Sequence, residues 1–469
     1  MSDDGMPSDS TSAHSESKGG ASWADLALEI WLEIFRFATH LPDAKTISQP
    51  NPFARKQPLG SVLNLSNPLT SMRTKTSIVC VSRAWRLVAT EILYEDLEIR
   101  SLHHAQKLLK CLIESDRAAP AYPRPTDGLH QSNGLCAKHL FVSPTLRDRM
   151  PYLKCIFDIM QQCPNVRFLN IVWDQSLPPA FLDSLARLYG RSLRGLHIGA
   201  DDDLDRSLRS RVRHPVHHVQ LEYQQQNVPE KVLTPLYVAR FTNLSVLDVR
   251  KVLWVEMDGN PTEEISMPSL HELILSNDSD SLTFASRLTL PSLRRVHMSL
   301  RFDISYDDTH LTCLTQFLEK HGRNITELDI KPLIACRRPP SPTARIAQYL
   351  EHCPRLEQIV YSAHDERIET LSTPHHALRR IGIRDIDWRE LSHNPRSVVS
   401  AGVKALLRSF DRDLTPNLDV VRTLDFMVET SISLSSVNTL MTWTEYFEKK
   451  GIDLEDGEGV VWLYEPSET

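Results

Sequence analysis

Apolar residues recur through most of the chain in a short unit, apolar-x-x-apolar-x-apolar. Clear copies lie at intervals between residues 165 and 383. They are NVRFLNI, SLRGLHI, NLSVLDV, SLHELIL, SLRRVHM, NITELDI, RLEQIVY and ALRRIGI. Weaker copies are YEDLEI, AKHLFV and VHHVQL, and TPNLDVVRTLDF fits the unit in two registers. Because alternating apolar residues indicate a strand with one buried face, each copy predicts one short strand.

The segments between these copies have the apolar spacing of helices. YLKCIFDIMQQC, AFLDSLARLYG, HLTCLTQFLEKHG, ARIAQYLEHC and VVSAGVKALLRSF all repeat apolar residues at intervals of three and four. Copies begin mostly 22 to 32 residues apart, close to the period of roughly 20–29 residues of leucine-rich repeats. We therefore expect an α/β fold in which strands and return helices stack into an irregular solenoid, with a parallel sheet on its concave side and helices outside.

One residue of each unit is expected to face the concavity. In a strand, the side chain between two buried positions points to the opposite face of the sheet. The resulting row is Phe141, Asn170, His197, Gln220, Asp248, Ile274, His297, Asp329, Val360 and Gly382. Solenoids bind partners on such surfaces, so we take this row as the candidate surface for a protein substrate. A solvated face, or one covered by the C-terminal tail, is the alternative.

The N-terminal part has a different pattern. LEIWLEIFRFAT, residues 28–39, predicts a helix whose apolar residues spread over more than half of its circumference. One core contact needs an apolar arc of only about 100°. The next segment contains prolines at positions 42, 50, 52, 58 and 68, which exclude a regular helix through most of it. A helical pattern then resumes in TSIVCVSRAWRLVATEILYEDLEI.

These two N-terminal segments resemble an F-box. That motif runs Leu-Pro-x-Glu-Ile-x-x-x-Ile-Phe, then Val-Cys-basic-x-Trp-Arg, then Leu-Tyr. The matching residues are Leu26, Glu29, Ile30, Ile34, Phe35, Val79, Cys80, Trp85, Arg86, Leu93 and Tyr94. Ala27 replaces the usual proline, the basic residue is shifted to Arg83, and about 35 residues are inserted between the halves.

The resemblance implies a three-helix module that docks on the Skp-type adaptor of a cullin-based ubiquitin ligase. The repeats likewise resemble the leucine-rich-repeat half of many F-box proteins. The expected organisation is a disordered tail over 1–22, an F-box over 23–97 with a loop insertion at about 40–74, and the repeat domain over 98–469. The candidate adaptor-binding residues are Leu26, Leu28, Ile30, Trp31, Ile34, Phe35, Val79, Cys80, Trp85 and Leu93. Some of them must instead form the core of the module.

Composition narrows the class of protein. The chain has 469 residues, of which 41% are hydrophobic, and a net charge of −7, which gives no general attraction to nucleic acid or to an anionic membrane. Eight cysteines without CxxC pairs indicate reduced thiols, and the N-terminal segment lacks the apolar centre of a secretory signal. We therefore expect a cytosolic or nuclear protein without nucleic-acid or membrane partners.

Other candidate sites are weaker. The segment RHPVHH lacks a cysteine or carboxylate at the short spacing that a zinc site needs, and aspartates next to RSLRSRVRH offset its arginines. No GxGxxG, GxxxxGK[ST], GxSxG or HExxH pattern is present. We therefore expect no metal, no cofactor and no catalytic residue, and a receptor that acts by holding a substrate near a conjugating enzyme. A non-ligase interaction scaffold is the alternative, and an enzyme ranks behind both.

Overall fold

The computed structural model describes most of the repeats and the helices that precede them. The described residues are 26–39, 47–49, 51–54, 68–118, 132–143, 149–172, 177–199, 235–250, 265–276, 279–299, 308–331, 346–363, 373–428 and 434–462. The expected tail over residues 1–22 and the VHHVQL copy lie outside these ranges.

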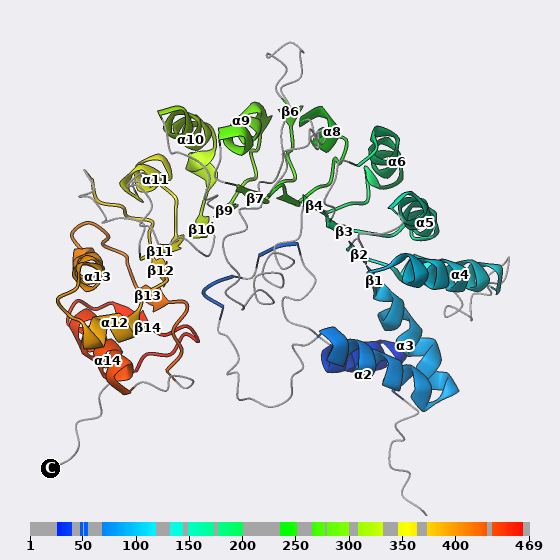
Figure 1. Cartoon of the computed structure of the whole chain (residues 1–469), viewed down its shortest axis with the longest axis horizontal. Coiled ribbons are helices and arrows are strands. Elements are labelled where there is room, and N and C mark those ends of the chain that lie inside the picture. The colour runs from blue at the N-terminus through cyan, green and yellow to red at the C-terminus, as the bar shows by residue number, and fades with distance from the viewer. Residues whose placement is uncertain are drawn as a thin grey trace, which may run out of the picture.

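A parallel sheet of twelve strands forms the inner side of an arch (Figure 1). Its strands, in both chain and spatial order, are β1 (Asp96–Ile99), β2 (His139–Val142), β3 (Phe168–Val172), β4 (Gly195–Gly199), β5 (Val246–Asp248), β7 (Glu272–Ser276), β9 (Arg295–Ser299), β10 (Glu327–Lys331), β11 (Gln358–Ser362), β12 (Arg380–Arg384), β13 (Val420–Thr423) and β14 (Asp453–Glu455). Two further short strands, β6 (Ile265–Ser266) and β8 (Leu288–Thr289), pair separately. Each strand thus pairs with the next one along the chain, as expected for a solenoid.

Helices return the chain between strands along the outer side of the arch (Figure 1). They are α4 (Leu102–Ala118), η2 (Asn133–Cys136), α5 (Arg149–Gln162), α6 (Pro179–Tyr189), α8 (Pro235–Ala239), α9 (Ser279–Arg287), α10 (Asp308–His321), η3 (Gly322–Asn324), α11 (Ile346–His352), α12 (Trp388–His393), α13 (Val398–Ser409) and α14 (Leu434–Glu448). The last two apolar positions of the units, such as Leu328 and Ile330, lie in one continuous core that runs from Leu97 to Leu454. The α/β class, the long parallel sheet and the outer helices agree with the sequence prediction.

At the C-terminal end, the structure contains one strand that the sequence did not predict and fixes the register of another. DLEDGE does not match the repeat unit, but its first three residues form β14 because Ile452 and Leu454 are buried against the preceding repeat. In TPNLDVVRTLDF, Val421 pairs in register with Ile381, which selects one of the two possible registers.

Three helices precede the sheet: α1 (Leu28–Thr39), α2 (Pro68–Val81) and α3 (Arg83–Glu95). The helical pattern after the insertion is divided at Ser82, whose hydroxyl accepts a hydrogen bond from the Trp85 amide and caps α3. The insertion is shorter than predicted because α2 begins at Pro68. Proline suits the first turn of a helix, where its missing N–H has no partner to lose.

No linker separates these helices from the sheet. Helix α3 ends at Glu95 and β1 begins at Asp96. The predicted boundary at residues 97–98 therefore falls inside a strand, and the helices lead directly into the first repeat.

Candidate functional site

One side of α1 forms the small core of the three helices. Phe35 is 2% exposed and packs with Ile78, Ala89 and Ile92. The ring of Trp85 lies 4.9 Å from the Phe35 ring and 5.2 Å from that of Trp31, centre to centre. Edge and tilted contacts at these separations are favourable for aromatic rings. The aromatic residues Trp31, Phe35 and Trp85 thus help to hold the three helices together.

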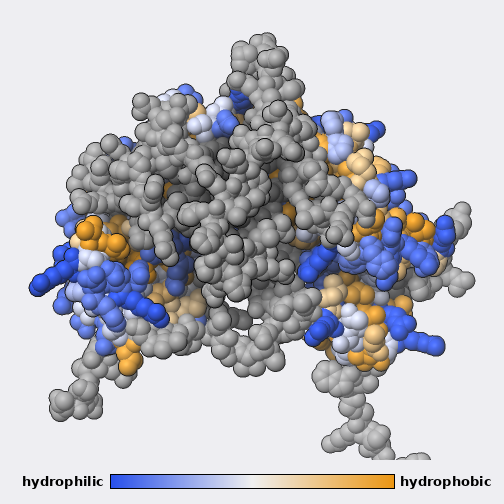
Figure 2. Space-filling model, viewed as in Figure 1, coloured by the Kyte–Doolittle hydropathy of each residue, from blue (hydrophilic) through white to orange (hydrophobic). Residues whose placement is uncertain are grey.

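Another side of α1 carries an apolar strip that this chain leaves exposed. Ile30 is 47% exposed, Ile34 40% and Phe37 87%. Positions separated by four and three residues lie along one side of a helix, so these three side chains form a single row. We call Ile30, Ile34 and Phe37 the α1 strip. Figure 2 shows apolar residues among polar ones over this helical region, at the lower right.

The structure separates the candidate adaptor residues into groups. Phe35 is buried, and Trp31, Val79 and Trp85 pack against the same core, so these four stabilise the module. The assignment of Phe35 to adaptor binding is therefore wrong, because a side chain buried among its own helices cannot contact an adaptor. Ile30, Ile34 and Cys80 are exposed, Leu26 and Leu93 are half-buried, and the side chain of Leu28 lies outside the described part. Phe37 was missed because it is not part of the motif.

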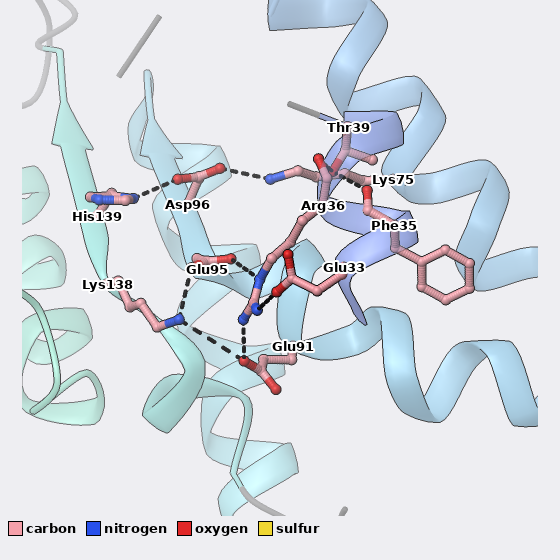
Figure 3. A network of polar contacts seen from close by, with 10 residues as sticks. All are labelled: Glu33, Phe35, Arg36, Thr39, Lys75, Glu91, Glu95, Asp96, Lys138 and His139. Atoms are coloured by element: carbon pink, nitrogen blue, oxygen red, sulfur yellow. Dashed lines mark hydrogen bonds and ion pairs between the residues drawn. The ribbon is translucent and has the colours of Figure 1, made fainter. Parts of the chain in front are cut away.

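A polar network connects the three helices to the sheet (Figure 3). Lys75 on α2, only 5% exposed, lies 2.6 Å from a carboxylate oxygen of Asp96, whose other oxygen lies 2.7 Å from Nδ1 of His139 on β2. Arg36 on α1 contacts Glu91 of α3, and Lys138, just before β2, binds Glu95 at 2.8 Å. Helix α1 and its exposed strip are therefore held in a defined position against the first two strands.

The predicted concave row lies in register across the sheet. Phe141 pairs with Asn170, Asn170 with His197, His197 with Asp248, and Asp248 with Ile274, and the line continues through His297, Asp329, Val360 and Gly382. Gln220 lies outside the described residues, and among the described strands β4 pairs with β5. Arg422 and Glu455 extend the row at its far end. They were missed because the register of the strand around Arg422 was left open and no strand was predicted around Glu455.

The row is not the open surface that the sequence suggested. His197, Asp248, Ile274, His297, Asp329 and Val360 are all buried, and only Phe141 and Asn170 are half-buried. Part of the cover comes from the insertion between α1 and α2. Residues 47–49 and 51–54, which we call the inner segment, lie within the arch against the sheet (Figure 1).

Ile47 anchors one end of the inner segment. It is buried with Val246 and Ile274, and Phe168 packs against the same cluster. Next to it, the Ser48 hydroxyl and the Gln49 amide donate hydrogen bonds to the carboxylate of Glu272 on β7, the latter at 2.8 Å. This end of the segment therefore lies over β3 to β7.

Phe53 anchors the other end. Its side chain is buried with Val360 and Leu424, and the guanidinium of Arg422 lies 5.5 Å from the ring centre. Arg422 also donates hydrogen bonds to the carbonyl oxygens of Pro52 and Ala54, at 3.3 and 3.2 Å. An apolar contact, a cation–π contact and two backbone hydrogen bonds thus converge on one short turn.

Charged side chains beneath the inner segment pair mainly with one another. His297 lies 3.3 Å from Asp329 and 3.4 Å from Glu272, and Arg384 binds the same Asp329. Burial by itself would lower the pKa of His297, but the two carboxylates outweigh burial and raise it. Burial would raise the pKa of Glu272, but the hydrogen bonds from His297, Ser48 and Gln49 lower it. This arrangement favours a charged His297 between two carboxylates.

Two other features that the sequence analysis considered lie outside the described residues: the arginines at 206–213 and the histidines at 214–218. Among the residues that are described, no three histidine, cysteine or carboxylate side chains are placed to hold a metal ion. No helix in the described ranges is both long and apolar enough to span a membrane.

Comparison with known proteins does not assign a family. No protein-family profile matches the chain, and no curated protein matches its sequence. A crystal structure of a protein from Bacteroides fragilis aligns with 64% of this chain and 68% of its own, at 11% sequence identity and a TM-score of 0.33. A similarity of this size supports no statement about function.

Proposed function

We propose that this chain is the substrate-recognition subunit of an Skp–cullin–F-box ubiquitin ligase, which docks on the adaptor through α1. The α1 strip carries the proposal, since it is an apolar row on a helix that the described part of the chain does not cover. Exposed apolar rows of this kind are typical of partner sites. The resemblance of both N-terminal segments to an F-box supports the same partner.

The mechanism needs no catalytic residue in this chain. A receptor raises the effective concentration of a substrate near the conjugating enzyme, and it does so best when its two binding surfaces keep a constant relative position. The ion pairs of Lys75 with Asp96 and of Lys138 with Glu95 connect the helices to the sheet. They support such a constant geometry between the α1 strip and the concave face.

The docking proposal is tested by recovery of a purified Skp-type adaptor on the immobilised full chain. Ile30→Asp with Ile34→Asp places charge on the α1 strip without touching the buried Phe35. Because each large apolar side chain contributes roughly 1.5–3 kcal/mol when buried, we expect adaptor affinity to fall at least about 100-fold.

The matched control is Val398→Asp with Val399→Asp, two exposed apolar residues at the start of α13. Asp is well tolerated in the first turn of a helix, so this variant should keep its fold and full adaptor recovery. Equal recovery with the α1 double variant and with wild type, both folded by circular dichroism, would rule out docking through α1.

The occupied concave face favours a second candidate, an adaptor-binding scaffold that presents no target. The two functions differ in the cell. For a substrate receptor, the Ile30→Asp and Ile34→Asp variant lengthens the half-life of the proteins that bind the concave face. For a scaffold, those half-lives do not change.

A further inference from the structure

The inner segment crosses the sheet and ends in a turn, where the Ala54 amide donates a hydrogen bond to the Asn51 carbonyl at 3.0 Å. Ile47 contacts β5 and β7, and Phe53 contacts β11 and β13, so their six-residue separation extends over the middle strands. Within its described residues the segment makes no strand pairing with the sheet.

Its contacts are those of a bound peptide. Two large apolar side chains at its ends are buried, while Ser48, Gln49, Asn51 and Pro52 between them are only half-buried. The sheet supplies one carboxylate, Glu272, to an amide and a hydroxyl, and one guanidinium, Arg422, to two carbonyls. Anchor pockets combined with a few backbone hydrogen bonds are a recurring mode of peptide recognition.

The face beneath the segment does not depend on it for charge pairing. Asp248 binds His197 at 2.9 Å and Arg250 at 2.7 Å, Asp329 binds His297 and Arg384, and Arg422 binds Glu455 at 2.6 Å. If the segment left, each of these charges would keep its partner and also gain water. Removal of the segment therefore exposes a surface whose charges remain paired, rather than one with orphaned charges.

We propose that the concave face is a groove for a short peptide segment of a protein partner, and that the inner segment is its internal competitor. The favoured partner segment has an aliphatic residue six positions before an aromatic one, with small polar residues and proline between them. This inference names the substrate class within the target-binding half of the proposed function, and it does not depend on the adaptor.

The groove is tested with a fluorescein-labelled peptide of residues 44–57, AKTISQPNPFARKQ. Its affinity is measured by fluorescence polarisation against the full chain and against Ile47→Ser with Phe53→Ser, which removes both internal anchors. A segment tethered at both ends competes at an effective concentration in the millimolar range, so a peptide with a dissociation constant near 10 µM should bind the opened variant about 100-fold more tightly than wild type. A control peptide with the same two substitutions should not bind.

Equal affinity for wild type and the folded opened variant, or equal affinity for both peptides, would overturn the proposal. If the variant does not fold, hydrogen exchange on wild type decides the question. An excess of unlabelled peptide should displace the segment and speed exchange of the Gln49 amide, which Glu272 otherwise protects. An unchanged exchange rate with the peptide at about 1 mM, on the order of the effective concentration, would overturn the proposal.

These outcomes are independent of the adaptor experiment. Peptide binding without adaptor recovery would leave the groove in place and remove the ligase proposal. Adaptor recovery without peptide binding would do the reverse.

Discussion

Individual charged side chains on the inner face are buried, and each is stabilised by a partner on a neighbouring strand. Burial alone would raise the pKa of Asp248, but His197 and Arg250 hold it far below its usual value. Because residues of one register row lie about 5 Å apart on adjacent strands, a charge on one strand meets the next strand directly. The mixture of polar and apolar residues in the row therefore reflects pairing within the sheet.

Two buried histidines should give opposite pH dependence. Burial lowers the pKa of His321 to about 4, and its Nε2–H donates to the carbonyl of Ala285. Below pH 6.5 the unfolded chain takes up a proton that folded His321 does not, so we expect the free energy of unfolding to fall by about 2 kcal/mol from pH 8 to pH 5 through this residue. His321→Gln should flatten that loss, as measured by urea unfolding across this pH range.

His297 should instead contribute more to stability at lower pH. Its pKa is raised because Asp329 and Glu272 face it, with Arg384 beyond Asp329. Its stabilisation is therefore complete below pH 6.5 and is lost as pH rises through the folded pKa. His297→Gln should destabilise the chain at pH 6 more than at pH 8. A difference that grows with pH would show that His297 is neutral in the folded chain.

Between several neighbouring repeats, an asparagine side chain before the strand makes a recurrent contact. Asn165, Asn243 and Asn417 donate side-chain hydrogen bonds to carbonyl oxygens of Leu135, Arg191 and His376, each in the preceding repeat, at 2.6 to 2.8 Å. Asn324 makes the same contact with Pro291 at 3.3 Å. The polar residue that precedes many of the apolar units thus connects adjacent turns of the solenoid.

The loss of stability where the N-terminal helices meet the sheet should depend on which member of the Lys75–Asp96 ion pair is removed. Asp96→Ala leaves the ammonium of Lys75 buried without its carboxylate, so it should lower the free energy of unfolding by about 3–5 kcal/mol. Lys75→Met removes the buried charge and leaves Asp96 with His139, so the loss should be below about 2 kcal/mol. Urea unfolding followed by tryptophan fluorescence compares the two. Equal losses would mean that leaving the Lys75 ammonium unpaired adds nothing to the cost of Asp96→Ala.

Over the whole arch, a local loss of stability should propagate from one repeat to the next. Among the described strands, each one pairs only with the strands next to it in the sheet, so a local defect weakens the adjoining repeats more than distant ones. Leu328→Ala on β10 removes a buried side chain in the middle of the core and should cost about 2–5 kcal/mol. Hydrogen exchange should increase most in β9 to β11 and least in β1 and β2. A uniform increase would indicate that the arch unfolds as one cooperative unit.

Much of this architecture follows from local pattern. The spacing of Leu193, Leu196 and Ile198, and of their counterparts in other repeats, placed the strands, their inward side chains and the order of the concave row. The pattern of residues 28–39 placed α1. Local periodicity succeeds here because each repeat packs only on its neighbours, so contacts stay close in sequence. It failed for β14, where a charged segment around a single Leu454 becomes a strand only against β13.

The tertiary structure decided which apolar and polar residues remain available to a partner. The sequence by itself determined that the chain is a repeat of strands and helices, because 2-residue and 3.6-residue periods are properties of the backbone. It could not show that Phe35 faces its own core while Ile34 faces solvent, since both lie on one broad apolar arc. Nor could it show that Ile47 and Phe53, hundreds of residues before β13, lie on the concave row. Contacts at that separation depend on how the arch closes around the insertion, and no local period records them.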